Sequence, residues 1–301
     1  MTLFKNEFSW SISRDDTFRK CQRMYFFHYY GSWGGWSNEI DERTRKIYIL
    51  KQLQTRKMWA GSKVHECIEK VIKNIHEGNQ TINVKKSIDE TLNIMRQEFS
   101  SSKKRKYLKE PKTCALFEHE YELQLPDIEW KNIANHVVEC LNSFFESNIY
   151  MIIFKLSNER WLEVEKFSSF QYNDVKVYVV PDFAFRDGDE IVIYDWKTGK
   201  EEANDHQLQL SCYGLYAIQQ WRIKAENIRT VEFYLSTGKQ NENLLTDFEL
   251  NPIHDYIGNS INVMKDMLDD QHVNIANEDQ FEFTMDGQAC QYCNFRKVCP
   301  R

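Results

Sequence analysis

The chain of 301 residues contains 14% aromatic residues and only 5 prolines, which indicates a folded globular protein and excludes a disordered one. Its formal net charge of -6 excludes a basic field over the whole surface, so a nucleic-acid partner has to be bound by a local patch. No apolar run is long enough to span a bilayer, and the start of the chain lacks the apolar segment of a signal peptide. We therefore expect a cytoplasmic protein without a membrane partner.

Helical patterns begin near the N-terminus. Ser13 can cap an aromatic, amphipathic helix that ends at Gly31 and carries Cys21 in its middle. The loop that follows presents Trp33 and Trp36, whose rings can stack on unpaired bases if they are exposed. Most aromatic side chains of the chain are nevertheless expected in the core.

A helical part is expected over about residues 40–150. A charged helical pattern covers residues 41–57, and a new helix opens at residue 59. His65 borders the apolar face of this helix, which consists of Val64, Ile68, Val71 and Ile75. Further helical patterns cover residues 84–99 and 128–150.

The most basic run of the chain, SSKKRKYLKEPK, covers residues 101–112. Such a run is either a solvated surface segment or a contact for nucleic-acid phosphates. Both interpretations stay open, because basic runs are common on protein surfaces.

Strand patterns begin after residue 160. Residues 161–172 alternate apolar and polar side chains, which predicts the first strand of a sheet. Strands over residues 175–185 and 190–196 flank a hairpin turn at Asp187-Gly188-Asp189. The remaining pattern predicts helices over residues 205–221 and 253–268 and strands over residues 231–236 and 246–250. We therefore expect one α/β domain over residues 1–301, with a helical insertion before a catalytic core at about residues 160–250.

The hairpin carries the residue types of a metal-dependent phosphodiesterase. Asp182 lies on its first strand and Asp195 on its second, and magnesium and manganese prefer carboxylate oxygens. Lys197 shares the strand face of Asp195, so its ammonium can orient or help to deprotonate an attacking water. Trp196 points to the other face, and its carbonyl is a candidate further ligand. The alternative is an ordinary hairpin with acids and a lysine on its exposed edges.

Pro181-Asp182, followed by Asp195-Trp196-Lys197-Thr198-Gly199, resembles the core of the PD-(D/E)XK nucleases in their RecB-like form. The resemblance implies a restriction-endonuclease-like fold with a central mixed sheet flanked by helices. It also implies that Gln209 contacts the site and that Tyr213, four residues on, contacts DNA or supports the lysine. Gln207 is a rival for the glutamine role, but it has no tyrosine at that spacing.

The same resemblance extends to acids and a histidine upstream of the hairpin. The run AGSKVHE is similar to a helix of these nucleases that supplies a metal ligand, which favours His65 as a ligand over a packed histidine. Glu163 and Glu165 are weaker candidates for the acidic cluster. One of the two is expected to face the site, and solvent exposure is the alternative.

Eight cysteines indicate metal ligands or buried thiols before disulfides in a reducing compartment. Cys290, Cys293 and Cys299, in residues 286–301, have the spacing C-x2-C-x5-C, which wraps a short loop around a soft metal centre. Cys21 is the best candidate for a fourth ligand. The other cysteines lie on or beside apolar helical faces or have no basic or aromatic setting: Cys67, Cys114, Cys140 and Cys212.

Iron-sulfur members of the superfamily, including the AddB-type helicase-nuclease subunit and the CRISPR-associated adaptation exonuclease, place one cysteine before the nuclease core and three after it. The likeness implies a structural [4Fe-4S] cluster that joins the two ends of the chain. Zinc in the same four thiolates is the alternative.

Together these patterns predict a hydrolase, a Mg²⁺- or Mn²⁺-dependent DNA nuclease. By resemblance it is an exonuclease on single-stranded ends, in DNA repair, recombination or antiviral defence. The chain contains no G-x-x-x-x-G-K-[ST] motif, so it lacks a helicase motor and either stands alone or serves a helicase or another protein subunit. The alternative is a non-catalytic DNA-binding or assembly subunit of a helicase-nuclease or CRISPR-type complex, which the intact acid, lysine, glutamine and tyrosine set disfavours.

Overall fold

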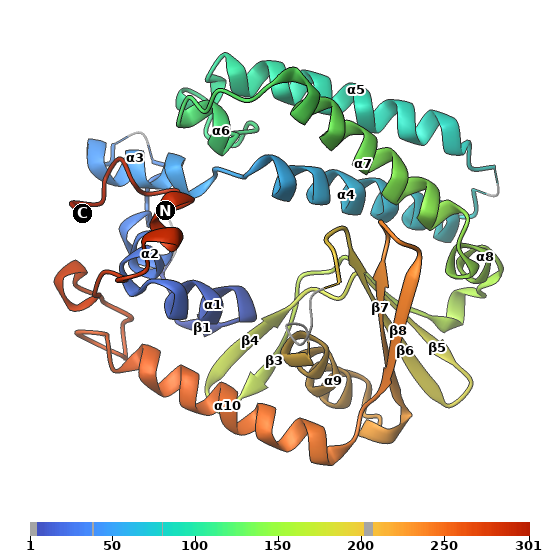
Figure 1. Cartoon of the computed structure of the whole chain (residues 1–301). Helices are drawn as coiled ribbons and strands as arrows, with labels where there is room; N and C mark the ends of the chain where they lie inside the picture. The colour runs from blue at the N-terminus through green and yellow to red at the C-terminus, as the bar shows by residue number, and fades with distance from the viewer. Residues whose placement is uncertain (1–4, 38, 80, 202–206) are drawn as a thin grey trace.

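The computed structural model describes residues 5–37, 39–79, 81–201 and 207–301 (Figure 1). Its helices are α1 (Ile12–Lys20), α2 (Gln22–Phe26), α3 (Glu42–Lys51), α4 (Arg56–His76), α5 (Val84–Lys103), α6 (Phe117–Glu120), α7 (Asp127–Phe145), α8 (Asn148–Lys155), α9 (Gln207–Trp221), α10 (Asp247–Lys265) and α11 (Gly287–Gln291). Its strands are β1 (Ser9–Trp10), β2 (Trp161–Val164), β3 (Ser168–Tyr172), β4 (Val175–Val179), β5 (Phe183–Asp187), β6 (Glu190–Lys197), β7 (Ile228–Tyr234) and β8 (Lys239–Leu244). Helices α4, α5 and α7 lie on one side of the strands and α9 and α10 on the other, which confirms an α/β protein with mixed sheets between helices.

The strands form two sheets where the sequence predicts one. The five-stranded sheet has the order β2-β5-β6-β7-β8, with β6 and β7 parallel and its other neighbours antiparallel. The other sheet has the order β1-β4-β3. The predicted strand over residues 161–172 breaks at Glu165, which has a left-handed φ of 45°. The predicted strand over residues 175–185 breaks at Pro181, which has no N–H to donate to a ladder.

Two further predicted elements differ from the structure for local reasons. Residues 246–250 do not form a strand, because Thr246 and Glu249 form a capping box that starts α10. Residues 128–150 hold two helices, since Ser147 accepts a hydrogen bond from the Tyr150 N–H and starts α8. The helix predicted over residues 205–221 is α9, although residues 205 and 206 lie outside the described residues.

Strand β6 separates two hydrophobic cores. Ile191 and Ile193 pack into the core that includes α1, α3, α9 and α10. The alternate side chains pack into the core that includes α4, α7 and α8, and they are Val192, Tyr194 and Trp196. Because successive strand residues point to opposite faces, this strand is apolar without interruption over residues 191–194. The same alternation places Asp195 and Lys197 on the face of Ile191, at the C-terminal end of the strand.

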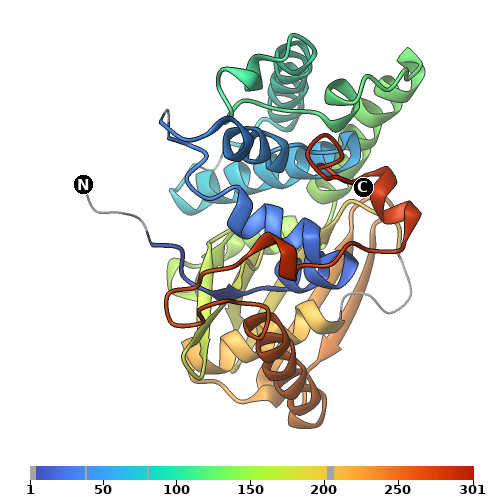
Figure 2. The same cartoon turned by 90° about the vertical axis from the view of Figure 1, so that its left-hand side faces the viewer.

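The two ends of the chain pack against each other, as Figure 2 shows for the N-terminal helices and the C-terminal tail. The Arg23 guanidinium donates a hydrogen bond of 2.7 Å to the Phe281 carbonyl and lies 2.9 Å from the Glu278 carboxylate. Phe27 packs against Phe295, with ring centroids 5.2 Å apart. The tail is therefore held by a buried cation and by aromatic packing.

The N-terminal helix differs from its predicted form. Ser11, and not Ser13, caps α1 by accepting a hydrogen bond from the Arg14 N–H. Cys21 does not lie in the middle of one helix. It has an extended backbone between α1 and α2, and its thiol sulfur accepts a hydrogen bond from the Met24 N–H that opens α2.

Within the described residues, no single helix combines the length and the apolar composition of a membrane span. One bent pair, α7 with α8 at 55°, has both only when the two helices are taken together.

Candidate active site

Asp182 and Asp195 meet where their strands lie side by side. Asp182 directly precedes β5, whose first residue, Phe183, pairs with Tyr194 of β6. Both carboxylates are buried, and Asp182 Oδ2 accepts a hydrogen bond of 2.5 Å from the Trp196 N–H. Burial raises the pKa of Asp182 to about 7, while the charge of His65 lowers this pKa and that of Asp195 raises it.

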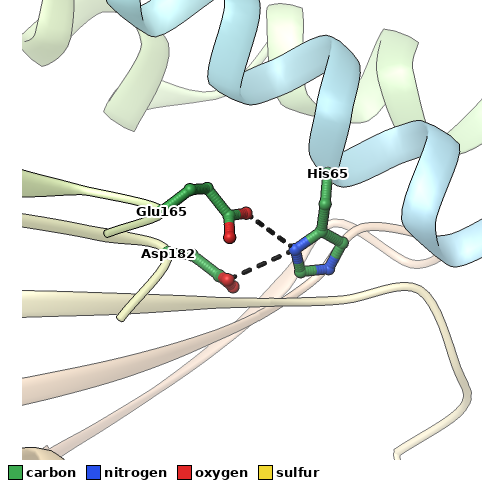
Figure 3. Close-up of side chains that lie close together, drawn as sticks. All are labelled: His65, Glu165 and Asp182. Atoms are coloured by element: carbon green, nitrogen blue, oxygen red, sulfur yellow. Dashed lines mark hydrogen bonds and ion pairs between the residues drawn. The ribbon is translucent and has the colours of Figure 1, made fainter. Parts of the chain in front are cut away.

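His65 reaches the acids from the helical side of the protein (Figure 3). Its Nδ1 atom lies 3.0 Å from Oε1 of Glu165 and 3.2 Å from Oδ1 of Asp182. Burial by itself lowers the pKa of His65, but the charges of Asp182 and Glu165 raise it well above its ordinary value. Helix α4 passes close to the segment after β6, because a Cβ atom on Gly61 would lie 3.0 Å from Oγ1 of Thr198.

Glu165 joins the site and Glu163 does not. The left-handed φ of Glu165 ends the strand alternation that would turn both acids to the same face. Glu165 also donates its backbone N–H to the Asp182 carbonyl at 3.0 Å. Glu163 is buried elsewhere, where its carboxylate accepts hydrogen bonds from Tyr216, Lys166 and Ser168.

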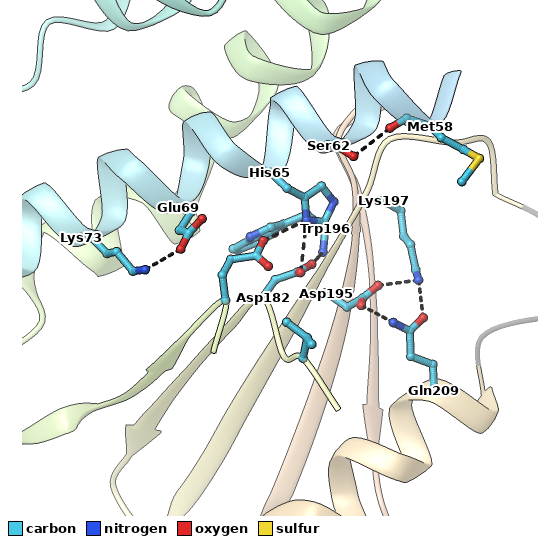
Figure 4. Close-up of polar contacts among 12 residues, drawn as sticks. Met58, Ser62, His65, Glu69, Lys73, Asp182, Asp195, Trp196, Lys197 and Gln209 are labelled. Atoms are coloured by element: carbon cyan, nitrogen blue, oxygen red, sulfur yellow. Dashed lines mark hydrogen bonds and ion pairs between the residues drawn. The ribbon is translucent and has the colours of Figure 1, made fainter. Parts of the chain in front are cut away.

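A hydrogen-bonded network links Lys197 to α9 (Figure 4). Lys197 Nζ lies 2.6 Å from Asp195 Oδ2 and donates a hydrogen bond of 2.7 Å to Gln209 Oε1. The Gln209 amide nitrogen donates to Asp195 Oδ1 at 2.9 Å and to the Tyr213 hydroxyl at 2.7 Å. Gln207 is exposed and lies outside this network.

Tyr213 supports the network from a buried position on α9. Its hydroxyl lies 3.0 Å from the Val180 carbonyl and 3.1 Å from Asp195 Oδ1, and donates a single proton between them. Burial and the Asp195 carboxylate raise the pKa of Tyr213 well above its ordinary value, so it stays neutral. Tyr213 therefore acts here as a support for Asp195 and Gln209.

Three of these side chains form a donor set for a divalent ion. The ligand atoms of His65, Glu165 and Asp182 all lie within 4.8 Å of one another. One imidazole and two carboxylates fit a hard or borderline divalent cation. Asp195 stands beside this set and is bonded to Lys197 and Gln209, while the Trp196 side chain packs on the opposite face against Phe144 and Phe233.

The sequence patterns do not indicate His136, which braces the segment after the lysine. Its Nε2 atom lies 2.8 Å from the Thr198 carbonyl oxygen, and it extends from α7. A lone histidine on an amphipathic helix carries no spacing signal, so only the packing of α7 on this segment identifies it.

The four cysteines of the predicted cluster line one cavity between the two ends of the chain. The cavity has a volume of about 30 Å³ and is lined by Cys21, Cys290, Cys293 and Cys299 together with Arg23 and Phe295 among others. Burial, together with the proximity of the other three thiols, raises the pKa of Cys293 to about 11. Cys67, Cys140 and Cys212 are buried in the interior instead.

The other predicted contacts lie on separate surfaces. Trp33 and Trp36 are partly exposed and pack edge to face, with ring centroids 5.1 Å apart. The basic run forms the end of α5 and the turn after it, where Arg105 pairs with Glu122 at 2.6 Å. A role for either in binding nucleic acid stays a prediction.

Comparison with known proteins identifies one family. A family model described as the PD-(D/E)XK nuclease superfamily matches residues 9–300. No curated protein matches the chain.

Proposed function

Because this chain belongs to the PD-(D/E)XK nuclease superfamily, we propose that it is a Mg²⁺- or Mn²⁺-dependent DNA exonuclease acting on single-stranded ends. Superfamily membership indicates a metal-dependent nuclease in general, and the single-stranded substrate is the finer part of the proposal. One observation carries the proposal of metal-dependent cleavage. His65, Glu165 and Asp182 converge on one point beside an Asp195–Lys197 pair, although they come from a helix, a loop and the start of a strand.

The proposed roles follow from these contacts. His65, Glu165 and Asp182 would hold the ion, with Asp195 and the Trp196 carbonyl as further ligands. A bound divalent ion supplies an acidified water and offsets negative charge on the phosphoryl oxygens. Lys197 would orient or deprotonate that water, and its Nζ atom lies 2.6 Å from Asp195 Oδ2.

Gln209 and Tyr213 act on the lysine and on the acid. Gln209 accepts from Lys197 through Oε1 and donates to Asp195 through its amide nitrogen, so a single side chain sets the position of both. Tyr213 in turn holds Gln209 and Asp195 from the buried side. We propose that this arrangement keeps Lys197 directed at the attacking water.

We also propose that Cys21, Cys290, Cys293 and Cys299 bind a structural [4Fe-4S] cluster. Their side chains line one cavity, which supports a shared centre. The resemblance of the cysteine spacing to that of iron-sulfur nucleases favours this cluster over zinc in the same four thiolates. The cluster would join α2 to the C-terminal tail.

We place this nuclease in the cytoplasm, in DNA repair, recombination or defence. A helicase or another subunit would open duplex DNA for it. The sequence contains no G-x-x-x-x-G-K-[ST] motif, the nucleotide-binding loop of a helicase motor, which supports a separate helicase.

Cleavage by protein prepared without air tests the proposal. Single- and double-stranded DNA labelled at either end is incubated with Mn²⁺ and either the unaltered protein or one variant. The variants are Asp195→Ala, Lys197→Ala and the control Asp189→Ala, whose acid lies in the exposed hairpin turn. We expect metal-dependent release of labelled nucleotides that the first two changes abolish and the control retains. Binding without any cleavage by the unaltered protein would instead indicate a non-catalytic subunit.

A further inference from the structure

Gln209 and Tyr213, which hydrogen-bond Asp195, also line a pocket. It has a volume of about 490 Å³, within the range of about 300–1,000 Å³ that is usual for small-ligand pockets. Its wall includes Gln209 and Tyr213 themselves, the start of α1 with Arg14, and two further aromatic side chains, Phe167 and Tyr178. The pocket is therefore continuous with the residues that hold Lys197.

Phe167 presents an aromatic face to solvent in this pocket. Its side chain is 68% exposed, and it stacks on Tyr178 with ring centroids 4.5 Å apart and 25° between the ring planes. Isolated exposed apolar side chains are common on proteins. Here the ring is held in place from beneath by another ring, and its free face remains available for a further planar group.

The loop that carries Phe167 also carries a member of the donor set. Glu165 and Phe167 both lie in the connection between β2 and β3. This loop is anchored twice, because the Glu165 N–H donates to the Asp182 carbonyl at 3.0 Å and Lys166 Nζ lies 3.3 Å from Glu163 Oε1. The position of the Phe167 ring is thus tied to that of the acids.

Charge in the pocket suits a nucleotide. The Arg14 guanidinium lies 4.2 Å above the Tyr29 ring, and it supplies positive charge to the pocket wall. Asp16 also lines the pocket, but its carboxylate is paired with Arg19 at 3.0 Å. A cation beside exposed rings is the combination that binds the backbone and bases of a single strand.

We propose that this pocket binds an unpaired nucleotide next to the cleaved phosphate, with its base stacked on Phe167. The inference rests on the proposed function and makes it more specific. A base in a duplex has both faces covered by its neighbours, so stacking on Phe167 selects a single strand or a frayed end.

The test uses the full chain carrying Lys197→Ala, so that DNA is bound and stays intact. The probe is a short oligo-dT labelled with fluorescein, with 2-aminopurine placed in turn at each position near its end. We expect fluorescence of 2-aminopurine to be quenched at one position, and Phe167→Ala to remove this quenching and to weaken binding about tenfold or more. Phe167→Trp should restore both.

A matched control and a substrate change separate stacking from a general loss of structure. Phe248, which is 86% exposed on α10, is changed to alanine and should leave quenching and affinity unaltered. Phe167→Leu keeps the apolar bulk without the aromatic face, so it should lose the quenching even if the alanine variant folds poorly. An abasic unit at the quenched position should weaken binding to the Phe167 form but cause no further loss in Phe167→Ala.

Equal binding by Phe167→Ala and Phe248→Ala, or additive losses from the abasic unit and Phe167→Ala, would overturn the inference. These binding measurements do not depend on cleavage. If the protein with Lys197 intact cuts DNA but Phe167→Ala binds DNA normally, only the pocket inference is rejected. If a base stacks on Phe167 but the protein with Lys197 intact never cuts DNA, only the nuclease activity is rejected.

Discussion

The Nδ1 atom of His65 lies 3.0 Å from Oε1 of Glu165, although the two residues are 100 positions apart in the chain. His65 belongs to α4 in the helical part, and Glu165 follows the edge strand of the five-stranded sheet. This contact therefore joins the helical part to the sheet, beside the Asp182 carboxylate. Changes here should alter metal binding before they alter folding.

Replacing Glu165 with glutamine should weaken Mn²⁺ binding by about tenfold or more, because the site loses one anionic oxygen donor. Glu163→Gln is the matched control, since Glu163 lies on the same segment but bonds Tyr216 and Ser168. Isothermal titration calorimetry with Mn²⁺ measures both variants. Equal affinities in the two would remove Glu165 from the set of ligands.

The lysine network predicts different outcomes for two neighbouring glutamines. Gln209→Ala should lower kcat by about 10- to 100-fold, because Lys197 and Asp195 lose the side chain that positions them. Gln207→Ala should leave kcat close to its original value, since Gln207 is exposed at the start of α9. Steady-state cleavage of single-stranded DNA checks the pair, and a similar loss in both would contradict this network.

Metal affinity should rise with pH. Burial raises the pKa of Asp182 to about 7, and the neighbouring carboxylates raise that of His65 well above its ordinary value. A cation must displace these protons, so Mn²⁺ binds more weakly as the pH falls below about 7 and releases protons when it binds. Calorimetry in buffers of different ionisation enthalpy at pH 6 and pH 8 measures that release. An affinity that is flat across this range would show that neither group holds a proton in the metal-free protein.

The thiol cavity predicts a colour and a stability change. Protein isolated without air should be brown, and Cys21→Ser should remove the visible band and lower the Tm by about 5 °C or more, because the two ends lose their link. Cys114→Ser is the control, since Cys114 does not line that cavity. A colourless protein that contains zinc would contradict the iron-sulfur assignment.

One stability prediction concerns the acid response of His28, which lies where the two ends of the chain pack together. Burial lowers the pKa of His28 to about 3, and its ring packs on Phe295 at 4.8 Å between centroids. In the unfolded chain His28 binds a proton near pH 6.5, whereas in the folded chain it binds one only near pH 3. The free energy of unfolding therefore decreases as the pH falls through that interval. Urea unfolding of the unaltered chain and of His28→Gln between pH 7 and pH 5 should show a shallower loss in the variant, and parallel slopes would refute this.

Local patterns in the sequence determined the parts of the site that lie close together in the chain. Period-two alternation placed Asp195 and Lys197 on one face of β6, and the helical spacing of Gln209 and Tyr213 brought both to one side of α9. The spacing of Cys290, Cys293 and Cys299 indicated a shared centre at the C-terminal end. These features depend only on backbone geometry over a few residues, whereas the position of Cys21 in the same cavity depends on the packing of the two chain ends.

The tertiary structure decided what depends on distant packing. Nothing in the sequence separated Glu165 from Glu163, because the choice follows from a left-handed residue at the end of β2. The meeting of His65 with the acids requires α4 to pack over the sheet, and the division into two sheets follows from the pairing of β4 with β1 and β3. Hydrogen bonds and burial between remote segments set these outcomes, and no periodicity along a single segment encodes them.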